Sequence, residues 1–130
     1  MWEEWFMGKR ILIIEDDLEM INLGGIFLRK AGYEVLSAVG GDMGLEVLRQ
    51  EPVDLVLLDI MMAGMDGWDV LETIRADRQW QNLPVIMLTA RHYLEDEEKT
   101  AAYAGMFTDY VVKPFIVRDL LQKIESALAV

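Results

Sequence analysis

The stretch DLVLLDIMMAGMDG, residues 54–67, decides the fold of this chain. Residues 54–58 have the composition of a strand that is buried on both faces. A carboxylate, Asp59, follows this run directly and is itself followed by a loop with two glycines. A charge at the end of a buried strand is costly unless it has a partner. We therefore expect Asp59 to stand at the edge of a sheet, close to other polar groups.

The size and composition of the chain indicate a single domain without a membrane span. It has 130 residues and no cysteine, and its apolar residues (53%) are spread over short runs. The 23 Asp and Glu against 12 Lys and Arg give a net charge of −11, which disfavours direct binding to nucleic acid or to a membrane surface. Because residues 1–10 lack the features of a secretion signal, we expect a cytoplasmic protein.

Apolar runs of strand length alternate with segments of helical spacing. The predicted strands are residues 10–14, 34–39, 54–58, 84–88 and 109–113. Their continuous apolar character is typical of a parallel sheet covered by helices on both faces, so we predict a doubly wound α/β domain. The helical spacing places Leu18 and Met43 on the faces of their helices that share apolar residues, and it predicts a fourth helix near residues 94–104.

One segment does not fit this alternation. Residues 1–8, which carry Trp2, Trp5 and Phe6, belong to none of the strand and helix units. We therefore expect residues 9–130 to form the domain and residues 1–8 to be an extra N-terminal segment.

Polar residues follow the predicted strands at their carboxyl ends, which is where open parallel sheets bind ligands. They are Glu15, Asp16 and Asp17 after the first strand, Asp59 after the third, Thr89 after the fourth and Lys113 after the fifth. Taken singly, Asp17 could cap a helix, Thr89 could begin a loop and Lys113 could be a solvated charge. Carboxylates that converge raise one another's pKa, so the cluster makes sense mainly if it holds a cation.

The ligand type favours magnesium. Carboxylate oxygens without cysteine indicate a hard ion, and a few carboxylates with water suit Mg²⁺ better than Ca²⁺. The single histidine, His92, is interpreted as a loop residue. Asp59 beside Mg²⁺, with Lys113 opposite, could attack a phosphoryl group and form an acyl phosphate, while Thr89 donates a hydrogen bond.

Four motifs carry a resemblance to a known family. They are ILIIEDD (11–17), LVLLDIMMAGMDG (55–67), IMLTA (86–90) and YVVKPF (110–115). In this order and spacing the chain resembles the receiver domain of two-component response regulators, including the chemotaxis regulators, over about residues 9–128. The resemblance implies a flavodoxin-like five-stranded parallel sheet of order 2-1-3-4-5 with five helices.

The resemblance also implies a role for each site residue. Asp59 would be the phospho-acceptor, and the metal ligands would be Glu15, Asp16, Asp59 and the main-chain carbonyl of Met61. Thr89 and Tyr110 would form the switch pair, and Lys113 would precede a cis bond to Pro114. For Tyr110, simple packing on the strand is the alternative.

A domain of this kind would be a signalling module and not an enzyme in the ordinary sense, although it catalyses its own phosphorylation. The donor would be a sensor histidine kinase or a phosphotransfer protein, with Mg²⁺ as cofactor. A downstream effector protein or domain would read the surface around the fourth helix, the fifth strand and the fifth helix; a homodimer is left open. Met61 and Arg91, two residues after Asp59 and Thr89, are poor general bases, so we expect slow self-dephosphorylation.

Two features depart from the usual pattern of the family. Ala63 stands where a proline is usual, which removes a restraint on φ and could loosen the loop. Four residues, MFTD, separate Gly105 from Tyr110 where three are usual. These differences bear on the loop beside Asp59 and on the partner surface.

Other classes of protein use similar carboxylates. A magnesium-dependent phosphatase of the haloacid dehalogenase type needs an aspartate where Met61 stands, and a nuclease of the topoisomerase-primase type needs an Asp-x-Asp pair that is missing near Thr89. A third alternative is an unphosphorylated scaffold. Because no effector domain follows Val130, the protein would either act alone or be the receiver part of a longer chain.

Overall fold

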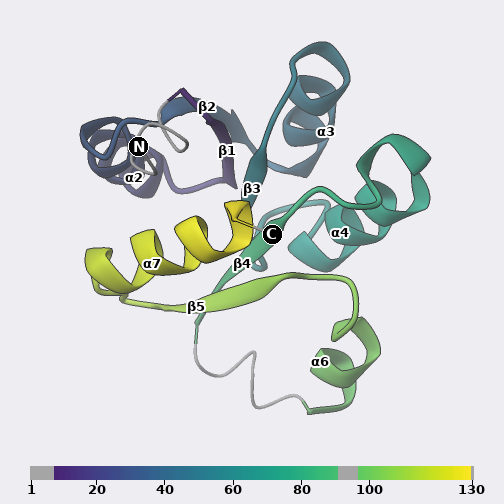
Figure 1. Cartoon of the computed structure of the whole chain (residues 1–130). Helices are drawn as coiled ribbons and strands as arrows, with labels where there is room; N and C mark the ends of the chain where they lie inside the picture. Colours follow the sequence, from purple (N-terminus) through teal and green to yellow (C-terminus); the bar gives the residue numbers. More distant parts are fainter. Residues whose placement is uncertain (1–7, 91–96, 130) are drawn as a thin grey trace.

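A computed structural model describes residues 8–90 and 97–129 of the chain. In this part, five strands form one parallel sheet of order β2-β1-β3-β4-β5 (Figure 1). The strands are β1 (Arg10–Glu15), β2 (Glu34–Val39), β3 (Leu55–Asp59), β4 (Val85–Ala90) and β5 (Asp109–Lys113). The predicted parallel sheet and its strand order are therefore confirmed.

Helices cover both faces of the sheet (Figure 1). The described residues form the helices α2 (Leu18–Lys30), α3 (Gly41–Gln50), α4 (Gly67–Ala76), α6 (Glu97–Tyr103) and α7 (Val117–Leu128), and a 3₁₀ turn, η1 (Arg78–Trp80). Helices α2 and α7 pack on one face, and α3 and α4 pack on the other. The predicted doubly wound architecture is confirmed.

Alternate residues of β1 belong to different hydrophobic clusters, which explains the continuous apolar runs. Ile11 and Ile13 join the cluster that contains α2 and α7, whereas Leu12 and Ile14 join the cluster that contains α3 and α4. A strand with helices on both faces must be apolar at successive positions. Strand β2 lies at the edge of the sheet and is partly exposed.

Three strands end later than the sequence predicts, because β1 includes Glu15, β3 includes Asp59 and β4 includes Thr89 and Ala90. Strand β3 begins at Leu55 and includes Asp59, which pairs with Leu88 of β4. Asp54 lies outside the strand, and its carboxylate accepts the main-chain N–H of Arg10 at 2.7 Å. Thr89 is likewise inside β4, which ends at Ala90. These two polar residues are thus held by the ladder of the sheet and not by a loop.

Leu18 and Met43, which helical spacing groups with apolar residues of their helices, are exposed, with exposed fractions of 62% and 56%. The buried faces combine isoleucine and leucine with glycines. An added Cβ on Gly24 would approach Ile13 to 3.2 Å, and one on Gly44 would overlap Ile14. Small residues let a helix approach a sheet closely, so these glycines lie on the buried faces together with larger apolar residues such as Leu28 and Leu48.

Several predictions fall outside the described residues. The fourth predicted helix corresponds to α6, but residues 94–96 are not described, and neither are Arg91, His92 and residues 1–7. In the part of the chain that the structure describes, no helix is long and apolar enough to cross a membrane.

Candidate functional site

Two aspartate caps direct the loops beside the carboxyl edge of the sheet. The Asp17 carboxylate accepts the main-chain N–H groups of Glu19 and Met20 at 3.0 and 3.4 Å and caps α2. Asp66 caps α4 in a reciprocal arrangement with Asp69. The helix-cap interpretation of Asp17 is therefore confirmed, and Asp66 is also a helix cap.

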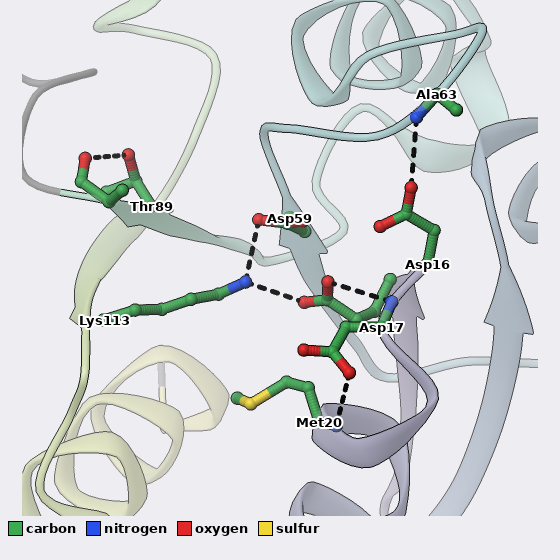
Figure 2. Close-up of polar contacts among 9 residues, drawn as sticks. Asp16, Asp17, Met20, Asp59, Ala63, Thr89 and Lys113 are labelled. Atoms are coloured by element: carbon green, nitrogen blue, oxygen red, sulfur yellow. Dashed lines mark hydrogen bonds and ion pairs between the residues drawn. The ribbon is translucent and has the colours of Figure 1, made fainter.

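Three residues from three strands meet at this edge (Figure 2). The Lys113 Nζ lies 3.0 Å from Glu15 Oε2 and 3.0 Å from Asp59 Oδ1. Both carboxylates are buried, whereas the Lys113 side chain keeps 27% of its surface exposed. The alternative in which Lys113 is only a solvated charge is therefore wrong, since its ammonium group pairs with two buried carboxylates.

Burial and charge shift the pKa values of this cluster. Burial, together with the nearby Asp59, raises the pKa of Glu15 from 4.5 to about 7 even though Lys113 acts in the opposite direction. Burial alone would lower the pKa of Lys113, but the hydrogen bonds and charges of Glu15 and Asp59 outweigh it and raise that pKa. The lysine thus stays charged, while one carboxyl of the pocket can carry a proton near neutral pH.

Asp16 supplies a third carboxylate with a different environment. It is exposed, and its Oδ2 accepts the main-chain N–H of Ala63 at 3.1 Å. Glu15, Asp16 and Asp59 each offer a carboxylate oxygen, and these oxygens lie within 4.8 Å of one another. An all-oxygen donor set with this spacing fits a hard divalent ion such as Mg²⁺.

Gly67 lies directly against the strand end that carries Asp59. An added Cβ would collide with the Asp59 carbonyl oxygen and the Ile60 Cα, and the Gly67 N–H donates to the Ile60 carbonyl at 2.8 Å. A residue without a side chain is therefore required for the loop to fold back over Asp59. The sequence predicted a turn here, but not this close approach of two main chains.

The predicted switch residues have different surroundings. The Thr89 hydroxyl is buried and donates to the Ala90 carbonyl at 2.9 Å, and Figure 2 shows it apart from Asp59. The Tyr110 side chain is 40% exposed. The Lys123 Nζ lies 5.0 Å from its ring centroid and donates to the Tyr110 carbonyl at 2.6 Å. The ring of Tyr110 is thus partly exposed and contacts Lys123, and its role as a switch residue or as a packing residue stays a prediction.

An aromatic cluster links α4 to α6. The Trp68 ring is buried and stacks on Tyr103 with centroids 4.7 Å apart, and it also lies 6.0 Å from the Phe107 ring. The Tyr103 hydroxyl donates to Glu72 Oε1 at 2.7 Å. In the sequence, the signal for this cluster is Trp68, the aromatic residue that directly follows Gly67, and its partners cannot be predicted from it.

The longer turn before β5 is anchored by an arginine. The Arg75 guanidinium donates to the main-chain carbonyls of Met106 at 2.7 Å and Trp80 at 2.8 Å. The Thr108 N–H donates to the Val85 carbonyl at 2.8 Å. The extra residue is thus accommodated by specific main-chain contacts, and β5 pairs with β4 in regular register.

The fold and this pocket define a class of protein. A flavodoxin-like sheet with acidic residues, threonine and lysine along its carboxyl edge, and a cis peptide bond between Lys113 and Pro114, matches what the resemblance implied. The response regulator receiver domain family matches residues 11–125, so the chain belongs to this family of phosphorylation-based two-component signalling proteins.

Known relatives and structures agree with this membership. The chain is 37% identical over 117 residues to the heme response regulator HssR of Staphylococcus epidermidis, covering 90% of this chain and 50% of the relative. It is 38% identical over 119 residues to the dual master transcriptional regulator RpaA of Synechocystis, covering 92% of this chain and 48% of the relative. The chain thus spans about half the length of the curated relatives it matches.

Two solved structures illustrate the similarity of fold. A response regulator from Chloroflexus aurantiacus superposes with a TM-score of 0.86 at 29% identity, covering 95% of this chain and 99% of the other. The response regulator TrrA of Thermotoga maritima, solved in complex with Mg²⁺ and BeF, superposes with a TM-score of 0.82 at 32% identity. The match covers 92% of this chain and 99% of the other.

Proposed function

We propose that the domain accepts a phosphoryl group on Asp59. The observation that carries this proposal is the position of the Lys113 Nζ, 3.0 Å from both Asp59 and Glu15 in a buried pocket. A cation held beside the nucleophile lowers the repulsion between its carboxylate and an incoming phosphoryl group. In the proposed step, an Asp59 oxygen forms a bond to phosphorus, and the bond from phosphorus to the donor breaks with its electron pair left on the donor.

The other pocket residues would position the phosphoryl group and compensate its negative charge. Glu15, Asp16, Asp59 and the Met61 carbonyl would hold Mg²⁺, which supplies positive charge to the phosphoryl oxygens when it is bound. Three carboxylate oxygens within 4.8 Å of one another support this ligand set for the side chains. Lys113 would compensate charge on the other side, and the Thr89 hydroxyl would donate to the phosphoryl group after exchanging its present acceptor, the Ala90 carbonyl.

Phosphorylation would act as a switch through Thr89 and Tyr110. The added charge and acceptor oxygens favour the state in which the Thr89 hydroxyl and Lys113 point at the phosphate, and the aromatic ring turns inward. The present outward position of the Tyr110 ring suits the unphosphorylated state. The output surface would lie over α6, β5 and α7. A surface groove of about 550 Å³ between β5 and α7, lined in part by Tyr110 and Lys123, supports the part of it at β5 and α7.

The partners follow from the same proposal. A sensor histidine kinase or a phosphotransfer protein would donate the phosphoryl group, and an effector protein or domain would read the output surface. Residues 9–130 would form the receiver domain, with residues 1–8 as an additional segment. A cytoplasmic location and the homodimer stay predictions, as does slow self-dephosphorylation, which a phosphorylated sample that loses its label within seconds at neutral pH would contradict.

Intact mass after incubation with acetyl phosphate and Mg²⁺ tests the proposal. The expected result is a gain of one phosphoryl group that is lost in Asp59→Asn. Asp54→Asn is the matched control, because Asp54 lies at the opposite end of β3 and contacts Arg10 instead of the pocket. No gain of mass in the wild type would favour the unphosphorylated scaffold. A gain that persists in Asp59→Asn would show that another residue accepts the phosphoryl group.

A further inference from the structure

A hydrogen bond joins the two loops that border the acidic pocket. The Ala63 N–H, from the loop between β3 and α4, donates to Asp16 Oδ2 at 3.1 Å across 47 residues of sequence. Figure 2 shows that the other Asp16 oxygen points to the side of Asp59. The bond therefore fixes which carboxylate oxygen faces the pocket.

Asp16 needs this contact more than the other two carboxylates do. Glu15 and Asp59 are buried and held by Lys113, whereas Asp16 is exposed. Within the described part of the chain, the Ala63 amide is the only hydrogen-bond partner of its carboxylate. An exposed side chain with no partner would sample several rotamers, and ordering it on metal binding costs free energy.

We propose that Ala63 is a positioning residue for the metal site, acting through its main-chain N–H on Asp16. This inference rests on the proposed function, because it requires Mg²⁺ to bind at the three carboxylates. Charge-assisted hydrogen bonds from groups outside the ligand set orient metal-binding carboxylates and sustain affinity. The replacement of the usual proline by Ala63 thus does more than remove a restraint on the loop, because alanine retains the main-chain N–H that proline lacks.

The variant Ala63→Pro removes the donor and leaves all candidate ligands in place. Asp16 would lose its restraint, so the Kd for Mg²⁺ should rise roughly 5- to 10-fold. The control variant Ala63→Gly keeps the main-chain N–H and should bind Mg²⁺ with a Kd within about 2-fold of the wild type. The readout is titration of the metal-free protein with MgCl₂, followed by ¹H–¹⁵N NMR, which requires no phosphorylation.

A double-mutant cycle separates positioning from a general effect on the loop. In an Asp16→Ala background, Ala63→Pro should cause no further loss of affinity, because the carboxylate that the amide restrains is absent. An equal loss in both backgrounds, or a Kd for Ala63→Pro within 2-fold of the wild type, would overturn the inference. If the wild type itself binds no Mg²⁺, the metal site of the proposed function fails, and the inference fails with it.

Hydrogen exchange provides a test that does not depend on folding of the proline variant. The Ala63 amide proton should exchange more slowly in the wild type than in Asp16→Ala, since only the wild type offers the carboxylate acceptor. Equal exchange rates in the two proteins would show that the bond does not persist in solution and would overturn the inference.

Discussion

Replacing the buried Glu15 by glutamine should remove a pH dependence of stability from the metal-free protein. Burial, together with Asp59, raises the pKa of Glu15 from 4.5 to about 7, so the folded protein binds this proton more tightly than the unfolded chain. The resulting stabilisation is complete below about pH 4.5 and is lost as the pH rises through about 7. At about 1.4 kcal/mol per pH unit, Glu15 lowers the free energy of unfolding by about 3 kcal/mol across this window.

The glutamine variant carries no titrating proton at this position. Its amide oxygen can still accept from Lys113, whose Nζ lies 3.0 Å from the Glu15 carboxylate. We expect the variant and the wild type to have similar free energies of unfolding near pH 5. At pH 8 the variant should be more stable by about 2–3 kcal/mol, because the wild type must then bury an additional negative charge.

Urea unfolding in EDTA between pH 5 and 8, followed by circular dichroism, measures this difference. Asp17→Asn is the control, since it removes a nearby exposed carboxylate but keeps a residue suited to cap α2. Its stability should follow the wild type at every pH. Adding Mg²⁺ at ten times its Kd should stabilise the wild type by about 1.4 kcal/mol at pH 8 and Glu15→Gln by less. A constant difference between Glu15→Gln and the wild type from pH 5 to 8 would refute the reasoning.

Three further substitutions test other parts of the pocket and its support. Lys113→Ala should destabilise the metal-free protein by about 2 kcal/mol at pH 8, because two buried carboxylates lose their cation; unchanged urea unfolding would contradict the ion pairs seen here. Gly67→Ala should cost about 1–3 kcal/mol, since the new Cβ collides with the Asp59 carbonyl. Gly105→Ala, whose Cβ would meet no atom within 4 Å, should keep its melting temperature, and equal melting temperatures for both variants would argue against close packing at Gly67. Trp68→Ala should cost about 3 kcal/mol by emptying a buried aromatic site between α4 and α6, and calorimetry showing no loss would mean that the stacked cluster contributes little.

The sequence by itself determined the class of fold and the candidate residues of the site. Strands buried on both faces must be apolar at successive positions, so five such runs separated by helical segments were sufficient to predict a covered parallel sheet. Because parallel strands present their carboxyl ends at one edge, Glu15, Asp59 and Lys113 could be expected to meet, and they do. The cap at Asp17 was equally predictable, since capping depends on local spacing.

Only the tertiary structure decided how these residues divide their contacts. That Lys113 contacts Glu15 and Asp59, while Asp16 turns to the Ala63 amide, depends on distances between chain segments that spacing along the sequence does not contain. The exposure of Leu18 and Met43 could not be predicted from helical spacing for the same reason, since it depends on how closely the buried faces with Gly24 and Gly44 approach β1. A sequence pattern reports which groups prefer burial, whereas the position of a main-chain N–H and the space left by a missing Cβ arise only when separate segments pack together.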